Sequence, residues 1–212
     1  MLHSSGFIVV EGLEGAGKST VIDAIRDFLS KKGQVVVCTR EPGGTPMAEA
    51  IRECVKHPWA EEEVTQETEL LLMYAARSQL VQNVIKPALA SNYYVVGDRH
   101  DLSSLAYQGG GRRVELTKLH QLRQLTLGDF VPDFTLYLDI DPSLGLERAR
   151  GRGELDRIEM AGLDFFKRAR QVYINTIRSM PNAIQIDASQ SVGEVKKDVL
   201  SALDNWYQNR SL

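Results

Sequence analysis

The residues from Gly12 to Ser19 have the spacing that most clearly predicts chemistry. They read Gly-Leu-Glu-Gly-Ala-Gly-Lys-Ser, match the pattern G-x-x-x-x-G-K-[ST], and lie between a short apolar run and a segment with helical spacing. Glycines let successive backbone N–H groups point at one anion, the lysine reaches the β- and γ-phosphates, and the hydroxyl ligates Mg²⁺. The pattern therefore predicts a phosphate-binding loop for ATP. Its predicted ATP-binding residues are Gly12, Gly15, Gly17, Lys18, Ser19 and Thr20.

A second group with chemical potential is a cluster of arginines near residues 148–157. They are Arg148, Arg150, Arg152 and Arg157. Guanidinium groups this close repel one another unless an anion binds or carboxylates pair with them, and Glu147, Glu154 and Asp156 are near enough in sequence to do so. The glycines of the segment offer hinge points. We expect either a solvated helix end or a cover that closes over a bound anion.

The composition restricts the classes of partner. The 212 residues carry 25 Lys and Arg against 28 Asp and Glu, a formal charge of -3, which disfavours a polynucleotide ligand. No apolar stretch reaches the roughly 18 to 20 residues that a membrane span needs. The only cysteines, Cys38 and Cys54, have no metal-ligand spacing and suit a reducing compartment. We expect a cytoplasmic protein with no membrane partner.

The elements that must position these residues alternate along the chain. Helical spacing runs from Lys18 to Lys32, from about Pro46 to Val55 and from about Thr68 to Ala90. Such alternation predicts an α/β fold with a parallel five-stranded sheet and helices on both faces, and its ligands bind beyond the carboxyl ends of the strands. The predicted strands are Phe7–Glu11, Gln34–Cys38, Tyr93–Val96, Phe134–Leu138 and Ala183–Ile186.

Two further motifs follow predicted strands. Arg40-Glu-Pro-Gly-Gly-Thr45 comes after the second strand, and the segment from Asp98 to Gln108 comes after the third. Together with the phosphate-binding loop they resemble the bacterial thymidylate kinase family over Phe7 to about Asp187. The resemblance implies one nucleoside monophosphate kinase domain over residues 1–212, with the P-loop kinase fold and a lid at about residues 148–159. It also implies Mg²⁺, a homodimer, and transfer of the γ-phosphoryl of ATP to dTMP.

The resemblance assigns the acceptor phosphate to cations at the ends of the strands. Arg99 grips that phosphate, Asp98 orients the Mg²⁺ shell together with Ser19, and Arg40 helps to position the acceptor. Arg52 reaches the same phosphate or lies on a solvated helix face. Two highly charged anions need cations on both sides of the transferring group, which is the separate physical reason for this arrangement.

By the same resemblance, other residues bind the nucleoside of dTMP. Glu14 approaches the sugar 3′-hydroxyl, Tyr107 excludes a ribose 2′-hydroxyl, and Arg77 donates to thymine O4. Ser104 and Gln108 complete the base pocket. The family usually places Phe four residues before this arginine to stack on the base. Here Met73 takes that position and Tyr74 follows, so either residue, or neither, contacts the base.

The lid is expected to supply a cation at the transition state, since position 15 is Gly and not the arginine of some relatives. Arg152 and Arg157 are the candidates for this cation. The predicted catalytic residues are therefore Lys18, Arg99, Arg152 and Arg157. By the same resemblance, Arg148 packs on adenine. Two other functions remain open. One is a kinase for another nucleotide. The other is an ATP-dependent switch, although no N-K-x-D segment of the GTPase type is present.

Overall fold

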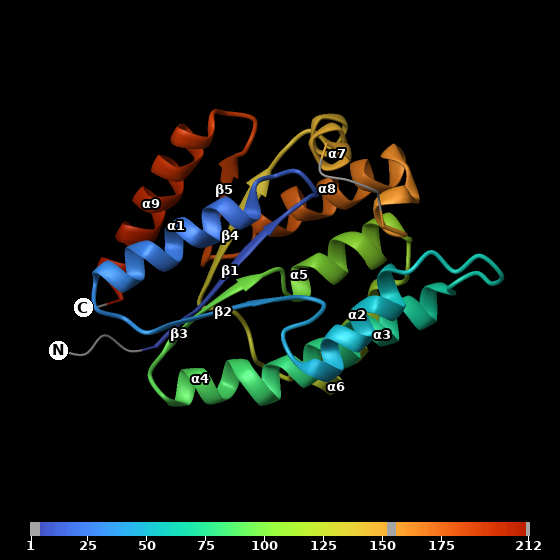
Figure 1. The fold of residues 1–212 in the computed structure, drawn as a ribbon, viewed down its shortest axis with the longest axis horizontal. Helices are drawn as coiled ribbons and strands as arrows, with labels where there is room; N and C mark the ends of the chain where they lie inside the picture. Colours follow the sequence, from blue (N-terminus) through green and yellow to red (C-terminus); the bar gives the residue numbers. More distant parts are fainter. Residues whose placement is uncertain (1–4, 152–155, 211–212) are drawn as a thin grey trace.

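The computed structural model describes residues 5–151 and 156–210. Its centre is one five-stranded parallel sheet in the order β2-β3-β1-β4-β5 (Figure 1), which confirms the predicted α/β fold class. The second strand begins two residues later than predicted, because the chain after α1 turns at Gly33 before it pairs with β3. The strands are β1 (Phe7–Gly12), β2 (Val36–Arg40), β3 (Tyr94–Asp98), β4 (Phe134–Asp139) and β5 (Ala183–Asp187).

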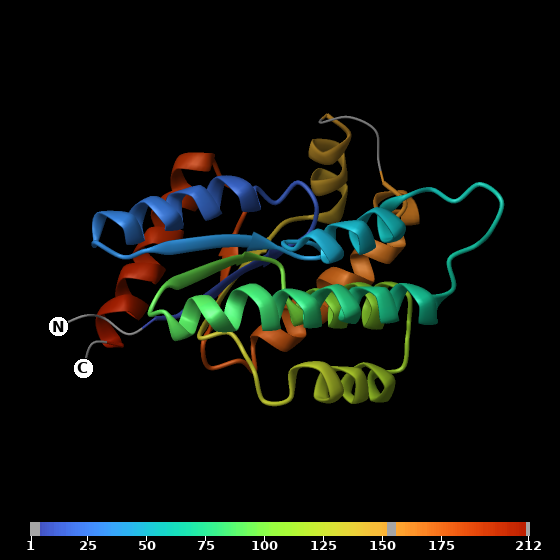
Figure 2. The ribbon, with the colours of Figure 1, turned by 60° about the horizontal axis from the view of Figure 1, so that its bottom comes forward.

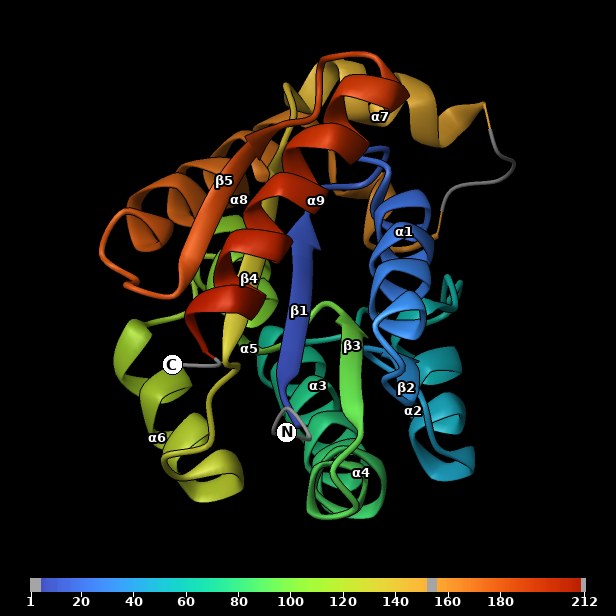
Figure 3. The same ribbon diagram turned by 90° about the vertical axis from the view of Figure 1, so that its left-hand side faces the viewer.

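Helices cover both faces of this sheet. On one face α1 contacts β1, β2 and β3, and α9 lies beside it against β5 (Figure 3). On the other face α4 contacts β3 and α8 contacts β4 and β5. The helices are α1 (Lys18–Lys31), α2 (Pro46–Lys56), α3 (Gln66–Leu80), α4 (Lys86–Ala90), α5 (Asp101–Ser104), α6 (Leu116–Leu127), α7 (Pro142–Arg150), α8 (Leu163–Ile177) and α9 (Val192–Asn209).

The predicted helix from Thr68 to Ala90 is present as an almost straight rod (Figure 2). It consists of α3, a π-helical turn at Val81–Ile85 and α4. A second π-helical segment, Leu105–Gly111, follows α5. Because each π-helical segment holds more residues per turn than an α-helix, it changes which side chains face the sheet.

The central strand β1 explains why both faces need helices. All six of its residues are buried, and successive side chains of a strand point to opposite faces. Phe7 and Val9 pack against the α3–α4 rod, whereas Ile8 and Val10 pack in the cluster that contains the apolar face of α1. A continuous apolar run is therefore the sequence that this position in a parallel sheet requires.

Local capping fixes where the helices near the sheet edge begin. Thr45 accepts a hydrogen bond from Ala48 N, and Pro46 occupies the first turn of α2, where no donor is lost. Gly17, with φ of 86°, turns the chain into α1. Within the described ranges no helix is long and apolar enough to cross a membrane.

Candidate active site

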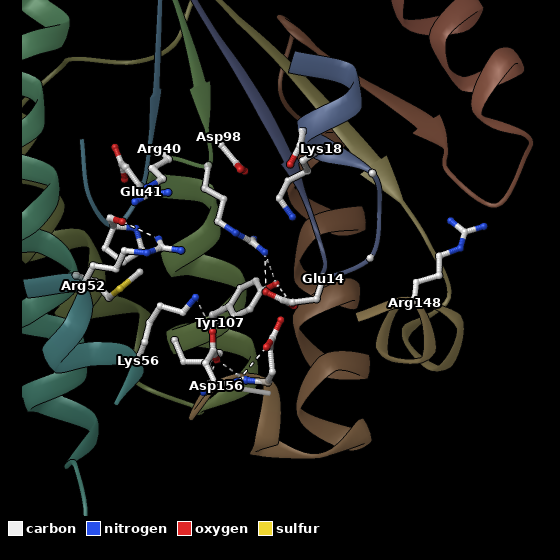
Figure 4. A pocket seen from close by; sticks show the side chains of 18 of the residues that line it. Glu14, Lys18, Arg40, Glu41, Arg52, Lys56, Asp98, Tyr107, Arg148 and Asp156 are labelled. Atoms are coloured by element: carbon white, nitrogen blue, oxygen red, sulfur yellow. Dashed lines mark hydrogen bonds and ion pairs between the residues drawn. The ribbon is translucent and has the colours of Figure 1, made fainter. Parts of the chain in front are cut away.

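A cavity of about 450 Å³ lies at the carboxyl ends of β1, β2 and β3, the edge where ligands of such sheets bind (Figure 4). It brings together side chains from the loop after β1, from α2, from α3 and from the segment after β3. The predicted site residues that line it are Glu14, Gly15, Gly17, Lys18, Ser19, Thr20, Arg40, Arg52, Met73, Asp98, Arg99, Tyr107, Gln108 and Arg148.

The phosphate-binding loop has the geometry that its glycines predict. Gly15, with φ of 74°, packs against the carbonyl of Gly145 in α7, so that a side chain at position 15 would collide with backbone. This contact gives a steric reason for glycine at position 15. It also places the loop directly beside the helix that leads into residues 148–159.

Lys18 folds back over the phosphate-binding loop. Its Nζ donates to the carbonyls of Gly12 and Leu13 at 3.2 and 3.0 Å. Burial, together with the positive charge of Arg99, lowers the pKa of Lys18 to about 8, although nearby carboxylates including Glu14 oppose this shift. An anion in the cavity would favour the charged lysine and take over hydrogen bonds now made to the loop.

The acidic residue of the loop, Glu14, is compensated by groups that follow β3. Arg99 Nη2 donates to Glu14 Oε1 at 2.7 Å, and the Tyr107 hydroxyl donates to Glu14 Oε2 at 2.7 Å. Arg99 also donates to the Tyr107 oxygen at 3.0 Å. The carboxylate of Glu14 and the phenol of Tyr107, which lie side by side in Figure 4, thus both contact the guanidinium of Arg99. Arg99 reaches this position from a left-handed backbone conformation, with φ of 73°.

A buried carboxylate beneath this group was not anticipated from the sequence. Glu11 Oε1 accepts from the backbone N–H of His100 at 2.9 Å, and Oε2 accepts from the hydroxyls of Ser103 and Tyr173 at 2.6 and 2.9 Å. Burial raises the pKa of Glu11, against the lowering effect of Ser103 and of the Arg99 charge. Glu11 therefore ties β1, α5 and α8 together around the turn that carries Arg99. The feature of the sequence that could have indicated this role is a single carboxylate at the end of the apolar run Phe7–Glu11.

Cations from α2 and from the end of β2 form the opposite wall. Arg52 Nη1 donates to the carbonyl of Pro42 at 2.8 Å, which directs a partly buried guanidinium along the cavity. Arg40 is more exposed and pairs with Glu49 at 2.8 Å. Lys56, which sequence reasoning missed, pairs with Asp156 at 2.9 Å across the mouth of the cavity.

Arg77 lies behind the cavity and does not line it. Its Nε donates to Glu41 Oε2 at 2.6 Å, Nη1 donates to Ser104 Oγ at 3.0 Å, and Nη2 donates to the carbonyl of His100 at 3.1 Å. Glu41 Oε1 also contacts His100 Nδ1 at 2.7 Å. Burial would raise the pKa of Glu41, but the charges of Arg77 and His100 hold it below its ordinary value. Ser104, like Arg77, is fully buried and off the cavity surface.

Met73 and Tyr74 point in different directions. Met73 lines the cavity. Tyr74 is buried behind it, donates to Asp101 Oδ1 at 2.8 Å, and lies under the guanidinium of Arg77, 4.8 Å from the ring centre. The one-residue step along α3 rotates the tyrosine out of the cavity, so this arrangement disfavours Tyr74 as a contact of a bound base.

Three of the four predicted lid arginines lie in the described part of the chain, and their surroundings differ; Arg150 is exposed at the end of α7. Arg148 is exposed and donates to the carbonyl of Ala188 at 3.1 Å. Arg157 does not line the cavity: its Nε donates to the carbonyl of Val55 at 2.8 Å, and its Nη2 lies 2.8 Å from Glu69 Oε2. Arg152, the other predicted catalytic arginine of the lid, lies outside the described residues.

The two residues predicted to bind Mg²⁺, Ser19 and Asp98, offer the kind of oxygen ligands that this ion uses. Ser19 and Asp98 line the same cavity, and Asp98 Oδ1 is buried with no hydrogen-bond partner among the described residues. Within those residues no group of three or more His, Cys, Asp or Glu side chains could hold a metal by itself. Mg²⁺ commonly binds through one or two carboxylates or hydroxyls together with waters and substrate phosphates, so these two residues fit it.

Comparisons with known proteins agree with this geometry. The family model "Thymidylate kinase" matches residues 10–199. The chain is 58% identical over 206 residues to "Thymidylate kinase" of Vibrio parahaemolyticus, covering 97% of this chain and 98% of the relative. It is 59% identical over 200 residues to "Thymidylate kinase" of Alteromonas mediterranea, covering 94% and 90% respectively. A third relative of that name, from Vibrio campbellii, is 56% identical over 206 residues, covering 97% and 98%.

Proposed function

The chain belongs to the thymidylate kinase family, and we propose that its cavity transfers the γ-phosphoryl group of ATP to dTMP, giving dTDP and ADP for dTTP synthesis. The single observation that carries the proposal is the Arg99–Glu14–Tyr107 group, which stands between a phosphate-binding loop and a second set of cations. An enzyme that transfers a phosphoryl group between two phosphorylated substrates needs a donor-phosphate site and an acceptor-phosphate site in one cavity.

On the donor side, Gly12 to Thr20 cradle the phosphates of ATP. The N-terminus of α1 and the backbone N–H groups of the loop favour anions there. Lys18 leaves the carbonyls that it now contacts and stabilises charge on the β- and γ-phosphates. Ser19 and Asp98 would hold Mg²⁺ and its water shell, and the ion would supply further positive charge to those phosphates. Arg148 packs on the adenine.

On the acceptor side, Arg99 holds the phosphate of dTMP, and Arg40 and Arg52 position it. In the absence of substrate, Arg99 and Glu14 form an ion pair, so neither charge is left unpaired in the cavity. The phosphate of dTMP then takes the place of Glu14 as a partner of Arg99. When the sugar enters, the Glu14 carboxylate accepts a hydrogen bond from its 3′-hydroxyl. Tyr107, fixed beside Glu14, occupies the space that a ribose 2′-hydroxyl requires.

The base of dTMP lies against Met73, with Gln108 at its polar edge. Arg77 is buried behind the cavity before the base enters. Its two Nη atoms each carry a second N–H beyond the bonds to Ser104 and His100, and one of these becomes available to thymine O4 when the base displaces the cavity wall. Ser104 orients that guanidinium. Because Tyr74 lies behind Arg77, we infer that its role is to support Arg77 through its ring.

Residues 148–159 act as the lid of a single kinase domain. Phosphoryl transfer spreads negative charge over the transferred group, and the glycine at position 15 adds no cation there. We propose that Arg152 supplies this charge and that Arg157 contributes by holding the lid to α2 and α3. The contacts of Arg157 with Val55 and Glu69 support this division of roles.

We further propose that the enzyme works in the cytoplasm as a homodimer. Cys38 and Cys54 are free and exposed, as suits a reducing compartment. Leu71 lies on α3 with 56% of its surface exposed, which suits a helix that packs against a second copy. Sedimentation of the parent and of Leu71→Glu tests the dimer: the parent is expected at twice the monomer mass, and the variant as a monomer.

The assay that tests the reaction measures ADP formation with Mg·ATP and each nucleoside monophosphate in turn. We expect dTMP to be the preferred acceptor by kcat/KM. Preference for a different monophosphate would change the assigned acceptor substrate but would still support a nucleoside monophosphate kinase. ATP binding with no phosphoryl transfer to any nucleotide would indicate an ATP-dependent switch and overturn the proposal.

A further inference from the structure

Glu69, in the first turn of α3, is a buried carboxylate that accepts hydrogen bonds from Gln108 and Arg112 and forms an ion pair with Arg157 behind the cavity. Only 1% of its side chain is exposed. Its Oε1 accepts from Gln108 Nε2 at 2.8 Å, and its Oε2 lies 3.1 Å from Arg112 Nη2 and 2.8 Å from Arg157 Nη2. These contacts join α3, the π-helical segment after α5 and Arg157 of the lid segment. Glu69 itself does not line the cavity, but Gln108 does.

The contact with Glu69 decides which end of the Gln108 amide faces the cavity. An ionised carboxylate can only accept hydrogen bonds, so the NH₂ group of Gln108 must point toward Glu69. The carbonyl oxygen Oε1 then points away. Oε1 is buried and has no hydrogen-bond partner within the described ranges. A buried acceptor without a donor is costly, and a ligand that supplies the donor relieves that cost.

Two arginines keep Glu69 in the acceptor-only state. Burial would raise the pKa of Glu69, but the hydrogen bond and charge of Arg112, the hydrogen bond of Gln108 and the charge of Arg157 hold it below its ordinary value. A neutral Glu69 would carry a proton and could donate to Gln108 Oε1. The amide could then turn over and present its NH₂ group to the cavity. The cations around Glu69 therefore protect one orientation of Gln108.

We propose that Glu69 is a positioning residue for base selection, which fixes Gln108 so that a hydrogen-bond acceptor faces the ring edge of the bound nucleotide. The inference rests on the proposed function. A pyrimidine with a protonated N3, such as thymine, donates to this oxygen. Cytosine has an unprotonated N3, which places a second acceptor opposite Gln108 Oε1. The pocket thus selects the 2,4-dioxo pyrimidine through a residue that does not touch it.

The test compares dTMP with 5-methyl-dCMP as phosphoryl-acceptor substrates, since the two nucleotides differ only at N3 and position 4 of the ring. The variant is Glu69→Gln, and its matched control is Glu67→Gln, which removes an exposed carboxylate two residues earlier on the same helix. An amide at position 69 can donate to Gln108 Oε1 and lets Gln108 turn over. We expect the ratio of kcat/KM for dTMP to that for 5-methyl-dCMP to fall by about tenfold or more in Glu69→Gln. The control should keep the parent ratio.

A purely structural role for Glu69 predicts a different pattern. Loss of packing or stability lowers kcat/KM for both nucleotides together and leaves their ratio unchanged. A folded Glu69→Gln with a ratio within about twofold of the parent would overturn the inference, since a lost buried hydrogen bond discriminates by more than that. If the parent itself shows no preference for dTMP, the proposed function fails first, so the two failures are distinguishable.

Glu69→Gln leaves Arg112 and Arg157 with less negative charge, and it is therefore paired with an exchange variant. Glu69→Gln combined with Gln108→Glu keeps the net charge, lets the amide at position 69 donate to the carboxylate at 108, and leaves an acceptor oxygen facing the base. We expect this double variant to fold and to prefer dTMP. Loss of that preference in the folded double variant, or failure of both variants to fold, would overturn the positioning role.

Discussion

Replacing Arg77 with methionine tests a buried charge pair at the back of the cavity. Arg77 is 0% exposed and Glu41 is 5% exposed, and their closest atoms are 2.6 Å apart. The substitution removes the guanidinium but keeps an unbranched side chain of similar length. Among the described residues, the Glu41 side chain then keeps His100 Nδ1 as its hydrogen-bond partner. A buried carboxylate that has lost its main counter-charge must either stay ionised at a large cost or take up a proton.

The size of the effect follows from this burial. Removing one partner of a buried ion pair costs about 3 to 5 kcal/mol of unfolding free energy. For a chain of this size each kcal/mol corresponds to about 2 to 4 °C in Tm, so we expect a fall of about 6 to 20 °C. Glu41→Gln/Arg77→Met should cost less than Arg77→Met alone, because it leaves no unpaired charge. Arg40→Met, which breaks an exposed pair with Glu49, should cost less than about 1 kcal/mol.

The pH dependence provides a second check. In the parent the folded-state pKa of Glu41 lies below its ordinary value, so its contribution is present above the unfolded pKa and is lost as pH falls through the folded one. In Arg77→Met that pKa rises above its unfolded value of about 4.3, which reverses the sign. The difference in stability between parent and variant should therefore be largest near neutral pH and shrink as the medium becomes acidic.

Urea denaturation of the parent, the single variants and the double variant, at neutral pH and near pH 5, measures these differences. The reasoning is refuted if Arg77→Met costs less than about 1 kcal/mol at neutral pH, the value for an exposed pair. It is also refuted if the double variant is as unstable as Arg77→Met and the loss does not depend on pH. Either result would mean that the Glu41 carboxylate is solvated or neutral in the folded protein.

Three further predictions concern catalysis. Lys18→Ala should lower turnover severely and leave the fold intact by circular dichroism. Lys31→Ala, at the other end of the same helix, should keep the parent turnover. Near-normal turnover of folded Lys18→Ala would contradict the assignment of the phosphate-binding loop. Steady-state kinetics should give a far higher kcat/KM for dTMP than for UMP, and comparable values would remove Tyr107 from the sugar pocket. Arg152→Ala/Arg157→Ala should lower kcat and kcat/KM together by about 10³-fold at saturating Mg·ATP with dTMP affinity nearly unchanged, Arg152→Ala accounting for most of it. A double variant within a few-fold of the parent kcat would make the lid a passive cover.

The fold follows from local features of the sequence. The apolar run Phe7–Glu11, the glycine-rich loop after it and the helical spacing from Lys18 to Lys32 each depend on residues a few positions apart. The structure confirms the predicted strands, with β2 displaced by two residues. The alternation of these elements restricts the topology to a parallel sheet, and a parallel sheet brings the loops after its strands to one edge.

Many of the predicted site residues reach the cavity for the same reason. Lys18, Arg99 and Tyr107 follow strands that end at this edge, so their sequence motifs are enough to place them near one another. Met73 and Tyr74 are different, because both lie on one helix and adjacent residues point in different directions. The rotation of α3 against the sheet selects Met73, and that rotation depends on packing.

The sequence alone determined the sheet, the phosphate-binding loop and the chemistry of the exposed cations. Only the tertiary structure decided the partners of the buried carboxylates: Glu11 meets Tyr173 across 162 residues, Glu41 meets Arg77 across 36, and Glu69 meets Gln108 across 39. A carboxylate is buried only if donors surround it, and no local pattern records donors that arrive from distant segments. The orientation of the cavity's polar groups is therefore set by packing between elements, whereas their types are set by motif.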